Sequence, residues 1–78
     1  MTRKLSLDAF RNREYKGMKR RTVTELFGSP DRDEGSGMFI YVYRLKAGDL
    51  IKVGCGIEVL YVRHTDENGV QLDELYKQ

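Results

Sequence analysis

Few side chains in this sequence are suited to covalent chemistry. Cys55 is the only cysteine and His64 the only histidine among 78 residues. A thiol beside an imidazole can form a nucleophilic dyad, but the strand pattern described below puts Cys55 near a turn and His64 at the far end of its strand. We therefore predict a core cysteine, a surface histidine and no enzymatic activity. A single cysteine also excludes an internal disulfide and a thiolate-rich zinc site.

A second group of possible ligands is the acidic segment formed by Asp31, Asp33 and Glu34. It resembles the start of a calcium loop, but the spaced ligands and the distal bidentate glutamate of an EF-hand are missing. The glycine-rich stretch 35–37 precedes a predicted strand, whereas a phosphate-binding loop joins a strand to a helix. The segment is thus predicted to be a solvated surface loop, with neither a metal nor a cofactor.

Basic residues gather in the N-terminal part of the chain. Residues 1–22 hold eight Lys and Arg against two acidic residues, a net charge of +6, and the remainder holds six against ten, a net charge of −4. Such asymmetry is found on nucleic-acid-binding surfaces and also on solvated helical faces. No aromatic residue interleaves the basic run, and no helix-turn-helix spacing is evident. The residues that would contact phosphates are Lys16, Lys19, Arg20 and Arg21.

Size and composition indicate one small globular domain covering residues 1–78. Charged residues make up 33% of the chain and hydrophobic residues 40%, and a chain of this length buries roughly 60% of its unfolded surface. No apolar run approaches the ~20 residues that span a bilayer. Charged residues interrupt the N-terminal segment, where a signal peptide needs an apolar core. We therefore predict a cytoplasmic protein with no membrane contact.

Two short helices are predicted, over residues 6–16 and 19–27. Gly17 suits the left-handed conformation that often ends a helix, and Pro30 cannot continue the helical hydrogen bonds. Apolar residues recur at helical spacing in both segments. The residues that should face the core are Leu7, Phe10, Val23, Leu26 and Phe27.

From residue 38 the apolar pattern changes to a period of two, which is typical of strands. Three strands are predicted, over residues 38–45, 50–55 and 58–64. Residues 70–76 are short enough to form either a fourth edge strand or a terminal helical turn. The predicted fold is α+β, with two short N-terminal helices packed on one face of a three- to four-stranded antiparallel β meander.

The predicted turns assign each strand residue to one face of the sheet. We take Ala47-Gly48 and Gly56-Ile57 as two-residue turns; a slip of one residue would exchange the faces. The face under the helices would then carry Ile40, Val42, Ile51, Val53, Cys55, Leu60 and Val62. The open face would carry Phe39, Tyr41, Tyr43, Val59 and Tyr61.

One pattern in the chain resembles a known family. Gly17-Met18, a short helix ending in Leu26-Phe27-Gly28-Ser29-Pro30-Asp31, and a strand with Tyr41 and Tyr43 resemble the SmpA/OmlA and β-lactamase-inhibitor-protein-like (BLIP-like) domains. The resemblance covers about residues 6–64. It implies two helices on one face of a curved antiparallel meander, in a binding or assembly module without catalytic residues. The chain departs from the family at Lys19, where a Thr usually follows Gly-Met.

The leading functional hypothesis is a non-enzymatic protein-interaction module that binds through the aromatic face. Its partner would be another protein or a second copy, in a homodimer. Tyrosines suit an interface because each offers a large rigid ring and a polar tip. The alternative is a nucleic-acid-binding accessory protein that uses the basic N-terminal helices, and its binding should weaken steeply with salt.

Overall fold

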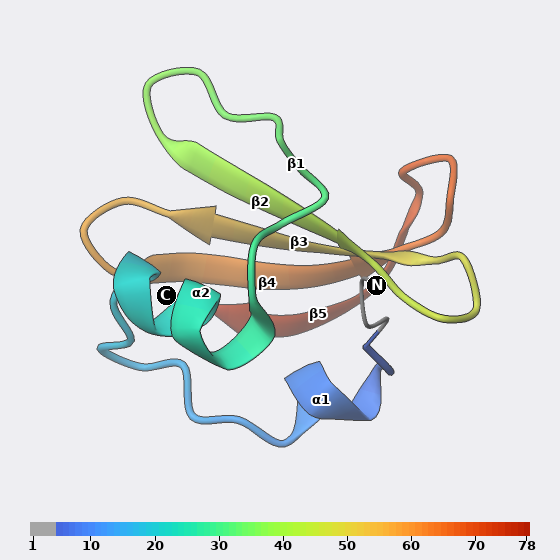
Figure 1. The fold of residues 1–78 in the computed structure, drawn as a ribbon, viewed down its shortest axis with the longest axis horizontal. Coiled ribbons are helices and arrows are strands. Elements are labelled where there is room, and N and C mark those ends of the chain that lie inside the picture. The colour runs from blue at the N-terminus through green and yellow to red at the C-terminus, as the bar shows by residue number, and fades with distance from the viewer. Residues whose placement is uncertain (1–4) are drawn as a thin grey trace.

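The computed structural model describes residues 5–78, which form an antiparallel sheet with two short helices on one of its faces (Figure 1). Strands β1 to β5 follow one another across the sheet in chain order. The α+β class is confirmed, but the sheet has five strands, because residues 32–33 and 71–77 add an edge strand on each side. The elements are α1 (Asp8–Arg11), α2 (Arg20–Phe27), β1 (Arg32–Asp33), β2 (Phe39–Arg44), β3 (Leu50–Cys55), β4 (Val59–Thr65) and β5 (Gln71–Lys77).

Helix α1 is much shorter than the predicted helix over residues 6–16. At helical spacing Glu14, rather than Tyr15, would follow Phe10 on the buried face. Because the chain leaves the helix after Arg11, Tyr15 can enter the core, where its hydroxyl donates a hydrogen bond to the backbone oxygen of Phe10. Arg3 and Lys4 of the basic segment lie outside the described residues.

Helix α2 agrees with its prediction to within one residue. It ends at Gly28, whose φ of +81° favours glycine and whose N–H bonds the Thr24 oxygen at 2.9 Å. Val23 and Phe27 point from α2 into the core and are buried. No helix within residues 5–78 is long or apolar enough to cross a membrane.

An aromatic cluster fills the space between the helices and the sheet. The rings of Phe10 and Phe27 stack with centroids 4.2 Å apart, and the Tyr43 ring lies 5.7 and 6.0 Å from them. The Tyr43 hydroxyl donates to the Gly28 oxygen at 2.9 Å, which satisfies it inside the core. Burial raises the pKa of Tyr43, so its phenol stays neutral. The aliphatic residues beneath this cluster are Ile51, Val53, Val59 and Val62.

The register between β2 and β3 differs by one residue from the prediction. Arg44 pairs with Leu50, so the connection spans residues 45–49 instead of a two-residue turn at Ala47-Gly48. Leu45 leaves the strand in this longer loop and is buried in the core. A slip of one residue exchanges the two faces of a strand, and the aromatic residues of β2 therefore lie on the side of the helices.

The predicted aliphatic face is consequently right for β3 and wrong for β2. Ile51, Val53, Cys55 and Val62 belong to the core as predicted. Ile40 and Val42 lie on the side away from the helices, because their neighbours Tyr41 and Tyr43 face the core. Leu60 falls in a bulge between the pairs Cys55–Val59 and Gly54–Tyr61 and stays outside the core.

The C-terminal segment is an edge strand, which settles the alternative between strand and helix. Residues 71–77 pair with β4, and Tyr76 packs its ring 5.8 Å from that of Tyr15. The turn before β5 is fixed by Asp66, whose carboxylate accepts the N–H groups of Asn68 and Val70, each at 2.9 Å. The segment extends the sheet and does not cover it.

Tyr15 predicts a loss of stability at alkaline pH. Burial raises the pKa of Tyr15 to about 12, from 10.0 for a free phenol. The stabilisation that the raised pKa of Tyr15 represents is fully present below pH 10. Between about pH 10 and 12 the unfolded chain releases this proton while the folded chain keeps it, so stability falls as the pH rises. The slope should reach about 1.4 kcal/mol per pH unit for this group.

Urea unfolding followed by circular dichroism at a series of pH values measures this slope. Tyr15→Phe should reduce the slope above pH 10, and Tyr15→Phe/Tyr43→Phe should reduce it further, leaving the part that comes from the raised pKa of Cys55. At pH 7 Tyr15→Phe should cost about 1 kcal/mol for the lost hydrogen bond. A slope that is identical in the wild type and in Tyr15→Phe would show that Tyr15 is not buried in the folded state.

Candidate functional site: a groove between α2 and the sheet

A groove of about 860 Å³ lies between α2 and the end of the sheet where β2 begins and β3 ends. We call it the α2–β2 groove. Its basic wall is formed at the start of α2 by Lys19, Arg20 and Arg21. Its apolar wall is formed by Met38, Phe39, Tyr41 and Ile57.

The basic wall is anchored to the turn between β3 and β4. The N–H of Val59 bonds the oxygen of Met18 at 2.8 Å, and Lys19 and Glu58 form an isolated antiparallel bridge. Lys19 Nζ also lies 3.5 Å from Glu58 Oε2. Gly17, with a φ of +77°, lies in the turn that leads the chain from Tyr15 into this contact. The start of α2 is therefore fixed beside the apolar wall.

Positive charge accumulates at the start of α2. The helix dipole already places a partial positive charge there, yet the first turn has no acidic residue and Lys19 provides no side-chain cap. Basic side chains at this end cost the helix a few tenths of a kcal/mol each. The ion pair that Arg21 makes within the helix is weak, because Arg21 Nε lies as far as 4.0 Å from Glu25 Oε1 and both side chains are exposed. The charges do not stabilise the helix, and they make its first turn a favourable place for an anionic group.

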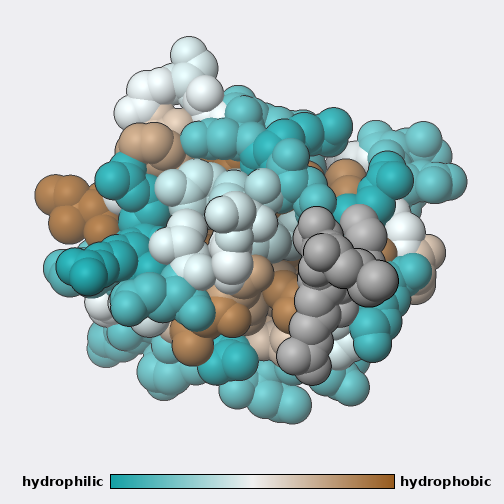
Figure 2. All heavy atoms as spheres, in the orientation of Figure 1, coloured by the Kyte–Doolittle hydropathy of each residue, from teal (hydrophilic) through white to brown (hydrophobic). Residues whose placement is uncertain are grey.

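Arg20 joins the two walls of the groove. Its guanidinium carbon lies 3.8 Å from the centroid of the Phe39 ring, close enough for a cation–π contact. Phe39 remains 40% exposed, and its ring lies 6.0 Å from that of Tyr41. Ile57 at the rim is 85% exposed. Figure 2 shows apolar spheres at the left edge of the molecule, where the β3–β4 turn lies in Figure 1.

The open aromatic face predicted from the sequence does not exist. Tyr43 and Val59 are buried in the core, because the register turns them toward the helices. Tyr61 lies on the opposite side of the sheet, where its ring covers Gly54 and the Arg63 guanidinium lies 4.1 Å from its centroid. Of the five predicted residues, two line the α2–β2 groove: Phe39 and Tyr41.

The predicted basic set is brought together only in part. Lys19, Arg20 and Arg21 line the groove, whereas Lys16 lines a separate hollow beside Tyr76. The sequence showed no aromatic residues within the basic run, but the fold supplies them from β2. The sequence did not indicate Met38 and Ile57, because a methionine at the start of a predicted strand and an isoleucine in a turn carry no functional signal of their own.

Cys55 and His64 are not a catalytic dyad. Cys55 pairs with Val59 and His64 with Ile51, so they lie at opposite ends of β3, roughly 13 Å apart along the strands. Burial raises the pKa of the Cys55 thiol to about 11, which keeps it neutral at pH 7. His64 is partly buried instead of being on the surface, and its Nε2 contacts the Asp49 carboxylate.

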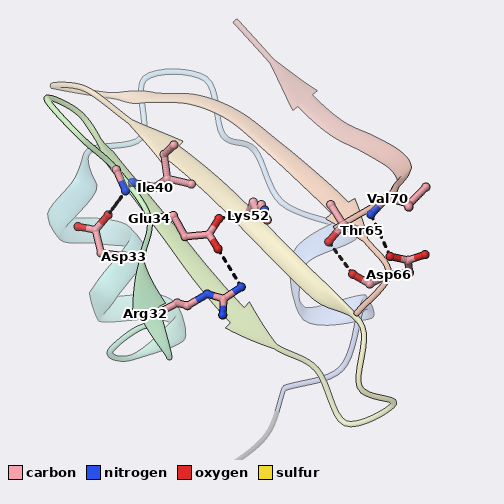
Figure 3. A network of polar contacts seen from close by, with 9 residues as sticks. Arg32, Asp33, Glu34, Ile40, Lys52, Thr65, Asp66 and Val70 are labelled. Carbon is pink, nitrogen blue, oxygen red and sulfur yellow. Dashed lines mark hydrogen bonds and ion pairs between the residues drawn. The ribbon is translucent and has the colours of Figure 1, made fainter. Parts of the chain in front are cut away.

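The acidic segment is exposed, as predicted, and is also tied to the sheet. Glu34 lies 2.8 Å from Arg32 and 2.9 Å from Lys52, on the face away from the helices (Figure 3). The hydrogen bond from Lys52 lowers the pKa of Glu34. Asp33 Oδ1 accepts the N–H of Ile40 at 3.0 Å. These carboxylates hold β1 against β2, and within residues 5–78 no three acidic, His or Cys side chains are grouped to hold a metal ion.

Comparison with known proteins identifies no relative. No family model, no curated protein and no solved structure matches this chain. The BLIP-like resemblance therefore stays a prediction.

Proposed function

We propose that this protein is a non-enzymatic interaction module that binds an extended protein segment in the α2–β2 groove. The segment would carry both aliphatic and acidic side chains. The observation that supports this proposal is the groove itself, in which Lys19, Arg20 and Arg21 face the exposed apolar residues Phe39 and Ile57. Carboxylates would contact the basic wall, and aliphatic side chains would cover the apolar one.

The same residues argue for protein over nucleic acid. Single strands bind through bases stacked on free aromatic faces along a basic track. Here Arg20 lies over one face of Phe39, while Met38 and Ile57 offer aliphatic surface that suits leucine-like side chains. The nucleic-acid alternative is supported by the three basic residues of the groove and is the second candidate function.

The BLIP-like resemblance is compatible with this proposal. The chain has two short helices followed by an antiparallel meander, which is the element order that the resemblance implies. Such domains are binding or assembly modules, so membership would favour a partner-binding role. The contact surface that we propose is the groove, and not the open sheet face.

Fluorescence anisotropy tests the proposal with a short labelled peptide in which leucine alternates with aspartate and glutamate. The wild type should bind it, and Arg20→Glu/Arg21→Glu should weaken binding by roughly 10- to 100-fold. This range follows from about 1–3 kcal/mol for reversing two partly exposed charges. Ile57→Ser should weaken binding without changing its salt dependence, because it removes only apolar contact.

The matched control is Arg11→Glu/Lys46→Glu, which makes the same change in charge at exposed positions outside the groove. It should bind the peptide within about 3-fold of the wild type, since distant exposed charges are screened. Equal losses in both double variants would show a general charge effect and would overturn the groove as the site. Tighter binding of a random single-stranded DNA, lost on reversal of Arg20 and Arg21, would support the nucleic-acid alternative instead.

A further inference from the structure

The chain carries on its own surface a segment of the chemistry that the groove fits. Val70, directly before β5, and Leu72, near its start, are 59% and 57% exposed. Glu67 in the preceding turn and Asp73 beside Leu72 are exposed carboxylates. We call these four residues the β5 patch. Residues 66–78 hold four acidic side chains and one lysine, a net charge of −3, opposite in sign to the groove.

The β5 patch lies at the end of the sheet opposite the groove. β4 starts at the turn that forms the groove rim and ends at Thr65, so the β4–β5 turn is at the far end (Figure 1). A chain that holds the groove and the patch at opposite ends cannot place the patch in its own groove. A second copy can.

We infer that copies of this chain associate head to tail, with the β5 patch of one copy seated in the α2–β2 groove of the next. The inference rests on the proposed function of the groove and names the partner as a second copy. Val70 and Leu72 would cover the apolar wall, and Asp73 would meet the basic one. Such a contact joins two different surfaces, so it repeats into chains or closes into rings.

Two copies could instead associate by pairing their sheet edges, but the edge strands are less suited to this than the patch and the groove are. Strand β1 has only two residues, and β5 contains two irregularities in its pairing with β4. Short edges and bulges hinder the addition of another strand. Side chains of the patch therefore make the contact, and the backbone of β5 does not.

Sedimentation velocity of the full chain, from micromolar to millimolar concentration at low salt, tests the inference. The mean mass of the wild type should rise with concentration and fall back to that of one chain on addition of salt. The groove variant Arg20→Gln/Arg21→Gln and the patch variant Leu72→Ser/Asp73→Asn should each sediment as one chain. Arg11→Gln/Lys46→Gln, a matched loss of two charges elsewhere, should associate like the wild type.

Mixing the two single-chain variants is the decisive measurement. The groove variant keeps its patch and the patch variant keeps its groove, so the mixture should form a one-to-one complex of twice the mass and nothing larger. A mixture that stays at the mass of one chain, with both variants folded by circular dichroism, would overturn the inference. So would a wild type of one mass at every concentration. If that wild type still binds the acidic leucine peptide, the inference fails and the proposed function of the groove stands.

Discussion

Phe10→Ala is expected to lower the free energy of unfolding by about 3–5 kcal/mol, the usual cost of truncating a fully buried phenylalanine. Phe10 has no exposed surface, stacks on Phe27 at 4.2 Å and lies beside Tyr43. A domain of this length is stable by about 4–12 kcal/mol in total. The variant should therefore lose between roughly a quarter and all of its stability, seen as a large fall in its resistance to urea.

The size of this effect comes from the shortness of α1. A helix of four residues is not stable by itself, and Phe10 is its only buried residue. Removing the ring takes away the fully buried contact of the segment and leaves it only partly buried ones, such as those of Leu7 and Ala9. Tyr15 would be released as well, because its hydroxyl bonds the Phe10 backbone.

Urea unfolding followed by circular dichroism measures this loss, and Leu26→Ala is the matched control. Leu26 is also a large apolar residue on a short helix but is 41% exposed. Its truncation should cost no more than about 1 kcal/mol. If Phe10→Ala costs as little as Leu26→Ala, the aromatic cluster between the helices and the sheet is not the core.

Helix α2 and strands β2 to β4 could be located from the sequence because their signals are local, whereas β1 was predicted to be a loop. Gly28 and Pro30 end α2 near the predicted residue, and the period of two begins within a residue of β2. The length of α1 could not be predicted, because it depends on whether Tyr15 gains more from burial than the helix loses by ending. That balance involves Tyr76, from the other end of the chain.

The faces of β2 could not be assigned, because both of them are apolar. Ile40 and Val42 alternate with Tyr41 and Tyr43, so either set could have packed under the helices. The choice depends on the length of the β2–β3 loop, which the sequence leaves open between two and five residues. The structure places the larger aromatic side chains in the core, where each ring buries more surface.

The sequence predicts residues of the groove in two separate groups, one assigned to protein binding and the other to nucleic-acid binding. The sequence predicts Arg20 as a phosphate contact and Phe39 as part of a protein interface, whereas the structure places the Arg20 guanidinium over the Phe39 ring. These residues are nineteen positions apart and belong to different elements. Only the tertiary packing of α2 on the start of β2 brings them together, and no local pattern encodes that distance.

Gly54→Ala is expected to destabilise the protein by about 1–3 kcal/mol, although alanine is normally the better strand residue. A Cβ at this position would lie 2.2 and 2.4 Å from two carbons of the Tyr61 ring, which covers the glycine across the β3–β4 pair. The Arg63 guanidinium stacks on the same ring and hinders its movement. The cost therefore comes from displacing Tyr61, and not from the backbone of Gly54.

A double-mutant cycle with Tyr61→Ala separates these causes. Without the ring, Gly54→Ala should become neutral or stabilising by up to about 1 kcal/mol, because alanine loses less backbone entropy than glycine. Gly56→Ala serves as the control, since its Cβ would meet only Leu60 at an ordinary 3.7 Å. Equal effects of Gly54→Ala in the two backgrounds would mean that Tyr61 does not lie over Gly54.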